Sequence, residues 1–123
     1  MPEPSLRDCR ILIVEDEYML ADELSRELED AGAIVLGPVG TLEDAIDLIQ
    51  SDEPIHGAIL DVNLRGEMAF AAADLLIERG VPLVFTTGYD VSALPLRFSG
   101  IVRCEKPIDM RKVAAAIGRV IHA

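Results

Sequence analysis

Short aliphatic runs alternate with amphipathic segments along most of this 123-residue chain. The runs are rich in Ile, Val and Leu, and they occupy residues 10–14, 34–36, 57–60, 83–86 and 101–103. Strands of this composition are typical of a parallel sheet whose two faces are both covered by helices. The alternation therefore predicts an α/β fold made of five βα units.

The segments between the runs have the period of amphipathic helices. Apolar residues recur at helical spacing in 20–31, 42–49, 69–76 and 110–121. Thr41 opens a sequence that resembles a capping box. Pro95 interrupts residues 90–99, so we expect the fourth helix to be short or irregular. Five units favour a flavodoxin-like doubly wound sheet of strand order 2-1-3-4-5.

Composition limits the classes of function. Residues 1–61 carry 16 acidic and 3 basic side chains, residues 62–123 carry 6 and 8, and the net charge is −11. We expect no nucleic-acid binding, because the DNA backbone selects a basic face. No apolar stretch reaches the ~18 residues of a membrane span, and the first ten residues lack the apolar centre of a signal peptide. The prediction is a cytoplasmic protein with no membrane association and one domain over 1–123.

Polar side chains follow four of the five predicted strands. Glu15 and Asp16 follow the first strand, Asp61 the third, Thr87 the fourth and Lys106 the fifth. In a doubly wound sheet, ligands bind beyond the carboxyl ends of the strands, at the switch point between the first and third strands. We therefore expect these side chains to converge there.

Three converging carboxylates would raise one another's pKa unless a cation kept them ionised. Oxygen ligands from Glu15, Asp16 and Asp61 suit Mg²⁺, and the chain has no EF-hand spacing that would indicate a Ca²⁺ cage. Together, Mg²⁺ and Lys106 would keep Asp61 anionic and nucleophilic and would neutralise charge in phosphoryl transfer. The Thr87 hydroxyl could donate to a phosphoryl oxygen.

The set Glu15-Asp16, Asp61, Thr87 and Lys106-Pro107 resembles the receiver domain of bacterial two-component response regulators, over about residues 10–121. The resemblance implies a receiver without an output domain, in which Asp61 is the phosphoacceptor. It also implies that Asp16 binds Mg²⁺ directly, Glu15 mainly through water, and Asn63 through its backbone carbonyl. Thr87 would be the switch hydroxyl, Lys106 the phosphate-contacting lysine, and the bond to Pro107 would be cis.

Two features depart from the family pattern. Arg103 occupies the position of the aromatic residue that usually rotates inward when the threonine engages phosphate. The sequence "PLVFTTGYD" is similar to a subgroup of stand-alone receivers that carry Phe-Ala-Thr-Gly-Tyr, with Thr86 in place of Ala. Asn63 and Tyr89 flank the phosphorylation site and are expected to set the hydrolysis rate.

The resulting hypothesis is a single-domain response regulator in a phosphorelay. A sensor histidine kinase or a histidine phosphotransfer protein would phosphorylate Asp61, and the receiver would then bind a downstream protein or pass the phosphoryl group on. We expect the partner surface within the less acidic residues 90–122. It would not be an enzyme beyond its own phosphorylation and dephosphorylation.

Three alternatives remain at this point. The first is a degenerate receiver that serves only as a docking module, which Arg103 keeps open. The second is a haloacid-dehalogenase-like phosphatase, which would need an acid at the position of Asn63. The third is an FMN carrier, although the loop after the first strand is acidic and the chain contains no Trp to stack on a flavin.

Overall fold

Five parallel strands form the central sheet in the computed structural model, which describes residues 5–88 and 94–123. The strand order is β2-β1-β3-β6-β7, which is the predicted order 2-1-3-4-5 of the βα units. The strands are β1 (Arg10–Val14), β2 (Ile34–Val39), β3 (Gly57–Asp61), β6 (Leu83–Thr87) and β7 (Val102–Glu105). The doubly wound fold predicted from the sequence is therefore confirmed.

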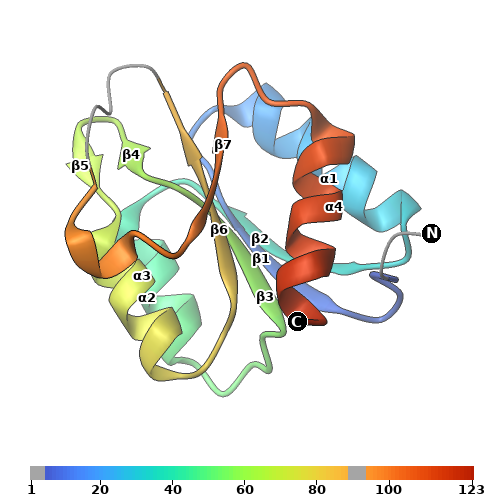
Figure 1. The fold of residues 1–123 in the computed structure, drawn as a ribbon, viewed down its shortest axis with the longest axis horizontal. Helices are drawn as coiled ribbons and strands as arrows, with labels where there is room; N and C mark the ends of the chain where they lie inside the picture. The colour runs from blue at the N-terminus through green and yellow to red at the C-terminus, as the bar shows by residue number, and fades with distance from the viewer. Residues whose placement is uncertain (1–4, 89–93) are drawn as a thin grey trace.

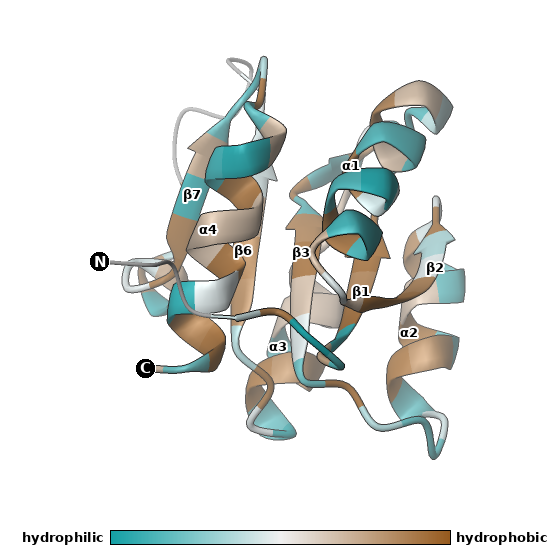
Figure 2. Ribbon diagram, turned by 90° about the vertical axis from the view of Figure 1, so that its right-hand side faces the viewer, coloured by the Kyte–Doolittle hydropathy of each residue, from teal (hydrophilic) through white to brown (hydrophobic). Residues whose placement is uncertain are grey.

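Helices cover both faces of the sheet (Figure 1). The helices α2 (Leu42–Gln50) and α3 (Phe70–Glu78) pack on one face, and α1 (Tyr18–Asp30) and α4 (Met110–Ile121) pack on the other. Each face has its own apolar core, and the apolar strands β1, β3 and β6 run between the two layers (Figure 2). Among the described residues, no helix combines the length and the apolarity needed to cross a bilayer.

Local signals mark where the helices begin and end. The Thr41 hydroxyl accepts a hydrogen bond of 3.1 Å from the Asp44 N–H, which caps α2 as expected. The Asp109 carboxylate caps α4 in the same way, accepting from the backbone N–H of Arg111. Gly32 follows α1 with φ +91°, a left-handed conformation that glycine adopts without steric cost.

The structure corrects the bounds of two predicted strands and adds a hairpin. The second strand extends to Val39 instead of ending at residue 36, because the Val39 carbonyl accepts from the Glu15 N–H after a register irregularity in the pairing with β1. The fifth strand covers Val102–Glu105 instead of 101–103, because its pairing with β6 continues to Glu105. A hairpin of β4 (Asn63–Leu64) and β5 (Glu67–Met68) was not predicted, since two-residue strands have no detectable period.

The predicted fourth helix falls partly on residues 89–93, which lie outside the described residues, and in the described residues 94–101 the chain forms the short 3₁₀ turn η1 (Leu96–Phe98). Phe98 anchors this turn, because its ring is fully buried and lies 5.5 Å, centroid to centroid, from both Phe70 and Phe85. The Arg97 guanidinium adds two hydrogen bonds of 3.0 and 3.1 Å to the Asp74 carboxylate on α3. The turn η1 is therefore held to the core mainly by the buried ring of Phe98.

Replacing Phe98 with Ala should lower the free energy of unfolding by about 3–5 kcal/mol, because it leaves a cavity beside Phe85. Leu96 in the same turn is 89% exposed, so Leu96→Ala should change stability by less than about 0.5 kcal/mol. Urea unfolding of the two variants checks this. Similar losses in both would show that Phe98 is not the anchor.

Candidate functional site

Four strands place polar side chains at one edge of the sheet. Asp61 is the last residue of β3 and Thr87 the last of β6, and Lys106 directly follows β7. Glu15 and Asp16 directly follow β1. The parallel register pairs Asp61 with Thr86 and Thr87 with Glu105, so the ends of neighbouring strands lie level with one another.

Three carboxylates meet at this edge. Glu15, Asp16 and Asp61 each present an oxygen atom, and these atoms all lie within 4.8 Å of one another. The side chains of Glu15 and Asp61 are only 4% and 3% exposed, whereas that of Asp16 is 13% exposed. Two of the three acids are thus nearly cut off from water, and ionising them requires a compensating charge.

Lys106 supplies a positive charge to both buried acids. Its Nζ donates to Asp61 Oδ2 at 2.9 Å and lies 3.3 Å from Glu15 Oε1. Two backbone N–H groups also donate to the acids, from Glu17 to Glu15 Oε2 at 2.9 Å and from Asn63 to Asp61 Oδ1 at 3.1 Å. Both oxygens of Asp61 therefore have a donor, which holds the orientation of its carboxylate.

The pKa values of both buried acids are shifted upward, so Lys106 and the backbone donors offset the effect of burial only in part. Burial raises the pKa of Glu15 to about 7; the charge of Asp61 adds to the shift, while the Glu17 N–H and Lys106 oppose it. Burial also raises the pKa of Asp61, against the hydrogen bond and the charge of Lys106. For Lys106, burial lowers the pKa, but Asp61 and Glu15 outweigh it and the net shift is upward. With all three acids ionised, the cluster would carry more negative than positive charge, and a further cation would favour that ionised form.

The remaining residues singled out in the sequence take different positions. Thr87 is 2% exposed at the end of β6, and its carbonyl accepts a 2.7 Å hydrogen bond from the Lys106 N–H. The Lys106–Pro107 peptide bond is cis. Arg103 is exposed on the edge strand β7, paired in register with Phe85, and does not join the acidic cluster. Tyr89 lies outside the described residues.

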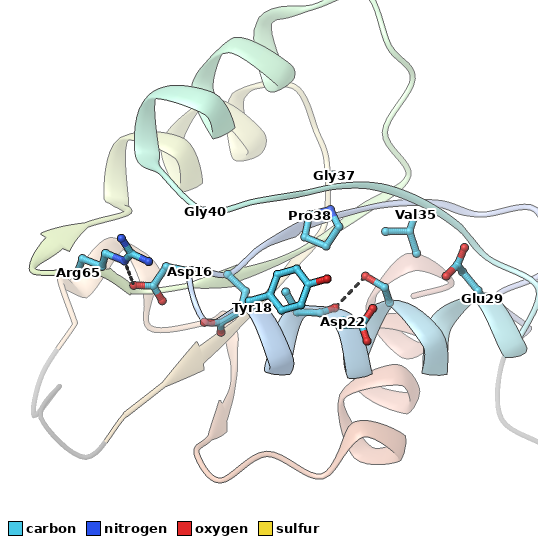
Figure 3. Close-up of a pocket in the computed structure, with 12 residues that line it drawn as sticks. Asp16, Tyr18, Asp22, Glu29, Val35, Gly37, Pro38, Gly40 and Arg65 are labelled. Carbon is cyan, nitrogen blue, oxygen red and sulfur yellow. Dashed lines mark hydrogen bonds and ion pairs between the residues drawn. The ribbon is translucent and has the colours of Figure 1, made fainter.

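Sequence reasoning did not identify Arg65. This residue lies at the tip of the β4–β5 hairpin, and its Nε is 3.6 Å from Asp16 Oδ2 (Figure 3). Arg65 and Asp16 close one end of a cavity of about 600 Å³ between α1 and the stretch from β2 to α2. The only local signal was Gly66, a turn residue, because the hairpin itself depends on tertiary packing.

Comparison with known proteins identifies the family of the chain, although no family model matches it. The sensory transduction protein LytT of Bacillus subtilis (strain 168) is 32% identical over 108 residues, covering 85% of this chain and 44% of LytT. The chain thus spans less than half the length of this curated relative. A response regulator receiver protein from Sinorhizobium medicae WSM419 shares the fold with a TM-score of 0.80 at 24% identity, over 97% of this chain and 98% of that one.

The solution structure of SdrG from Sphingomonas melonis Fr1 matches at a TM-score of 0.76 and 38% identity, over 89% of this chain and 96% of SdrG. The chain belongs to the response regulator receiver family. The receiver fold predicted from the residues at the strand ends is therefore confirmed, and receivers are signalling domains, not classical enzymes. Membership of the Phe-Ala-Thr-Gly-Tyr subgroup stays a prediction.

The raised pKa of Glu15 predicts how the receiver's stability depends on pH without a metal ion. Between pH 4.5 and about 7, folded Glu15 retains a proton that the unfolded chain loses, so the free energy of unfolding should fall as pH rises. The expected loss from Glu15 is on the order of 2 kcal/mol.

Urea unfolding in EDTA across this pH window measures the loss. Glu15→Gln should flatten the profile, and Glu43→Gln, at an exposed position on α2, should leave it unchanged. Equal slopes in all three proteins would contradict the burial of a protonated Glu15.

Proposed function

We propose that this receiver is a phosphoryl-accepting switch in which Asp61 takes a phosphoryl group from the phosphohistidine of a kinase or a histidine phosphotransfer protein. The observation that carries the proposal is the bridge from Lys106 Nζ to Asp61 at 2.9 Å and to Glu15 at 3.3 Å. This bridge holds a nearly buried carboxylate beside one cation, in a cluster with room for a second. That arrangement suits a nucleophile whose target is itself anionic.

The donor set fits Mg²⁺. The ion takes oxygen ligands at about 2.1 Å in an octahedron, so two opposite ligands lie about 4.2 Å apart. The oxygens of Glu15, Asp16 and Asp61 lie within 4.8 Å of one another, close to that spacing. Asp16 and Asp61 would hold the ion directly, with the Asn63 carbonyl, and Glu15 would act mainly through water. When bound, the ion would supply charge neutralisation between the carboxylates and the phosphoryl oxygens.

The transfer exchanges one bond for another. An oxygen of Asp61 attacks phosphorus, the P–N bond to the donor histidine breaks, and the imidazole nitrogen keeps the electron pair and takes up a proton. Lys106 stays beside Asp61 and balances the charge of the phosphoryl oxygens, while the Asn63 N–H orients the acceptor carboxylate. Water later cleaves the acyl phosphate, and Asn63 and Tyr89 would set the rate of that step.

Thr87 would transmit the change to the surface. Its side chain lies at the end of β6, and its carbonyl is already bonded to the backbone of Lys106. A Thr87 hydroxyl that turns towards a phosphoryl oxygen would therefore move the end of β6 relative to β7. Arg103 is exposed and is not positioned to rotate inward. The surface that changes on phosphorylation would therefore be formed by β7 and α4, which expose Arg103 and Arg111, and a partner would bind there.

The phosphatase alternative lacks its second acid, because Asn63 occupies that position. A pure docking module would not need two buried acids held by Lys106, since the burial that raises the pKa of Glu15 opposes stability once the unfolded chain loses that proton. We therefore propose an active receiver that signals by binding a partner or by onward phosphotransfer, as a domain over residues 1–123.

Incubation with a small phosphodonor and Mg²⁺ should add the mass of one phosphoryl group to the wild-type protein and none to Asp61→Asn. EDTA should abolish the addition, because the phosphoryl charge would then be uncompensated. Asp52→Asn, at an exposed acid outside the cluster, should be modified like the wild type. Intact mass spectrometry reads all four samples, and full modification of Asp61→Asn would sink the proposal.

Replacing Thr87 with Ala should separate phosphorylation from switching. The variant should still accept the phosphoryl group at Asp61. The changes in backbone amide NMR chemical shift in β7 and α4 on adding beryllofluoride and Mg²⁺ should be smaller than in the wild type, because the variant lacks the hydroxyl that donates to the phosphoryl oxygen. SdrG has been solved in a BeF₃-activated conformation, which shows that the probe works on a similar fold. Thr87→Ser should behave like the wild type; shifts of full size in Thr87→Ala would exclude this residue as the switch.

A further inference from the structure

We propose that Arg65 is a built-in competitor for the divalent cation: it neutralises Asp16 when no metal is bound and so lowers the affinity of the receiver for Mg²⁺. This inference rests on the proposed function, since it assumes that Asp16 is a direct ligand of the ion. It adds a residue that sets the affinity of the site.

The hairpin that carries Arg65 is unusually built. Asn63 pairs with Met68 and Leu64 with Glu67, which leaves a loop of only Arg65 and Gly66. Both loop residues have positive φ, +54° and +90°, the pattern of a type I′ turn. Such turns favour Asn or Gly at both positions, because a larger side chain is strained there.

The contact of Arg65 with Asp16 offers an explanation for an arginine at this strained position. Figure 3 shows the Arg65 side chain reaching back from the hairpin to Asp16, where Nε lies 3.6 Å from Oδ2. Within the hairpin, a 2.6 Å hydrogen bond from the Gly66 N–H to the Asn63 side-chain oxygen stabilises the turn. The turn therefore presents a guanidinium to the least buried acid of the cluster.

Two basic side chains of the described residues contact the cluster, and they are held very differently. The Lys106 side chain is 24% exposed and contacts both buried acids, so it is a fixed part of the site. The Arg65 side chain is 82% exposed and makes one longer contact, so water can solvate it as soon as it leaves Asp16. Arg65 is thus the cation that an arriving metal ion can displace.

Displacing Arg65 from Asp16 costs free energy, and this cost lowers the affinity of the site for Mg²⁺. A divalent ion on Asp16 takes the oxygens to which the guanidinium is paired and repels the guanidinium itself. The cavity beside Arg65 is otherwise acidic, because Glu15, Asp16, Asp22 and Glu29 line it. Removing the positive charge of Arg65 should therefore strengthen Mg²⁺ binding by about two- to fivefold, the range for an exposed ion pair.

Isothermal titration with Mg²⁺ alone tests the inference without any phosphoryl transfer. Arg65→Asn keeps a residue that suits positive φ and removes the charge, and Arg65→Lys keeps the charge. Arg26→Asn is the matched control, because Arg26 pairs with Asp22 on α1 and its loss changes the net charge equally. We expect tighter binding in Arg65→Asn, and wild-type affinity in Arg65→Lys and Arg26→Asn.

The salt dependence of Mg²⁺ binding distinguishes two effects of Arg65→Asn: loss of the ion pair with Asp16, and relief of backbone strain in the turn. The affinity ratio between Arg65→Asn and wild type should approach one as ionic strength rises from about 0.01 M to about 1 M, since screening removes the competition. A ratio that does not change with salt, or equal affinities of Arg65→Asn and Arg26→Asn, would overturn the competitor role. Absence of Mg²⁺ binding in every variant, or unchanged binding in Asp61→Asn, would instead overturn the proposed function, and the inference with it.

Discussion

The balance of charge between Lys106 and two nearly buried carboxylates is the interaction on which the rest of this site depends. Glu15 and Asp61 stand at the ends of adjacent strands, β1 and β3, and the sheet brings their oxygens together whether or not the charges are compensated. One ammonium at 2.9 and 3.3 Å offsets only part of the effect of burial, which raises the pKa of both acids. The burial of these acids is thus an electrostatic strain that a further cation would relieve.

Such strain is useful in a signalling domain. A site that opposes stability when empty gains free energy from each ligand that neutralises it, and a ligand shifts a conformational equilibrium only by its differential affinity for the two states. Here the ligands would be a divalent ion and then a phosphoryl group. The apolar cores on both faces of the sheet can carry this cost, because Phe98 and the strands β3 and β6 are buried in them.

The surroundings of the cluster differ in how firmly they are held. The backbone of Lys106 is joined to β6 by the 2.7 Å hydrogen bond from its N–H to the Thr87 carbonyl, so a movement at Thr87 would reach Lys106 directly. Arg65 comes from a strained two-residue turn and is mostly solvated. The receiver thus combines one permanent cation with one that can leave, and the edge strand β7 carries Arg103 outward where the family usually has an aromatic residue.

The sequence by itself determined the fold class and the strand order, because aliphatic runs of strand length between amphipathic helices have few compact arrangements. It also determined which strand ends carry Glu15, Asp16, Asp61, Thr87 and Lys106, since a parallel sheet brings carboxyl ends to one edge. Only the tertiary structure decided the extent of β2, the β4–β5 hairpin and the contact of Arg65 with Asp16. These features depend on strand pairing and on an ion pair between segments that are separated in the sequence, and the local hydrophobic period does not predict such contacts.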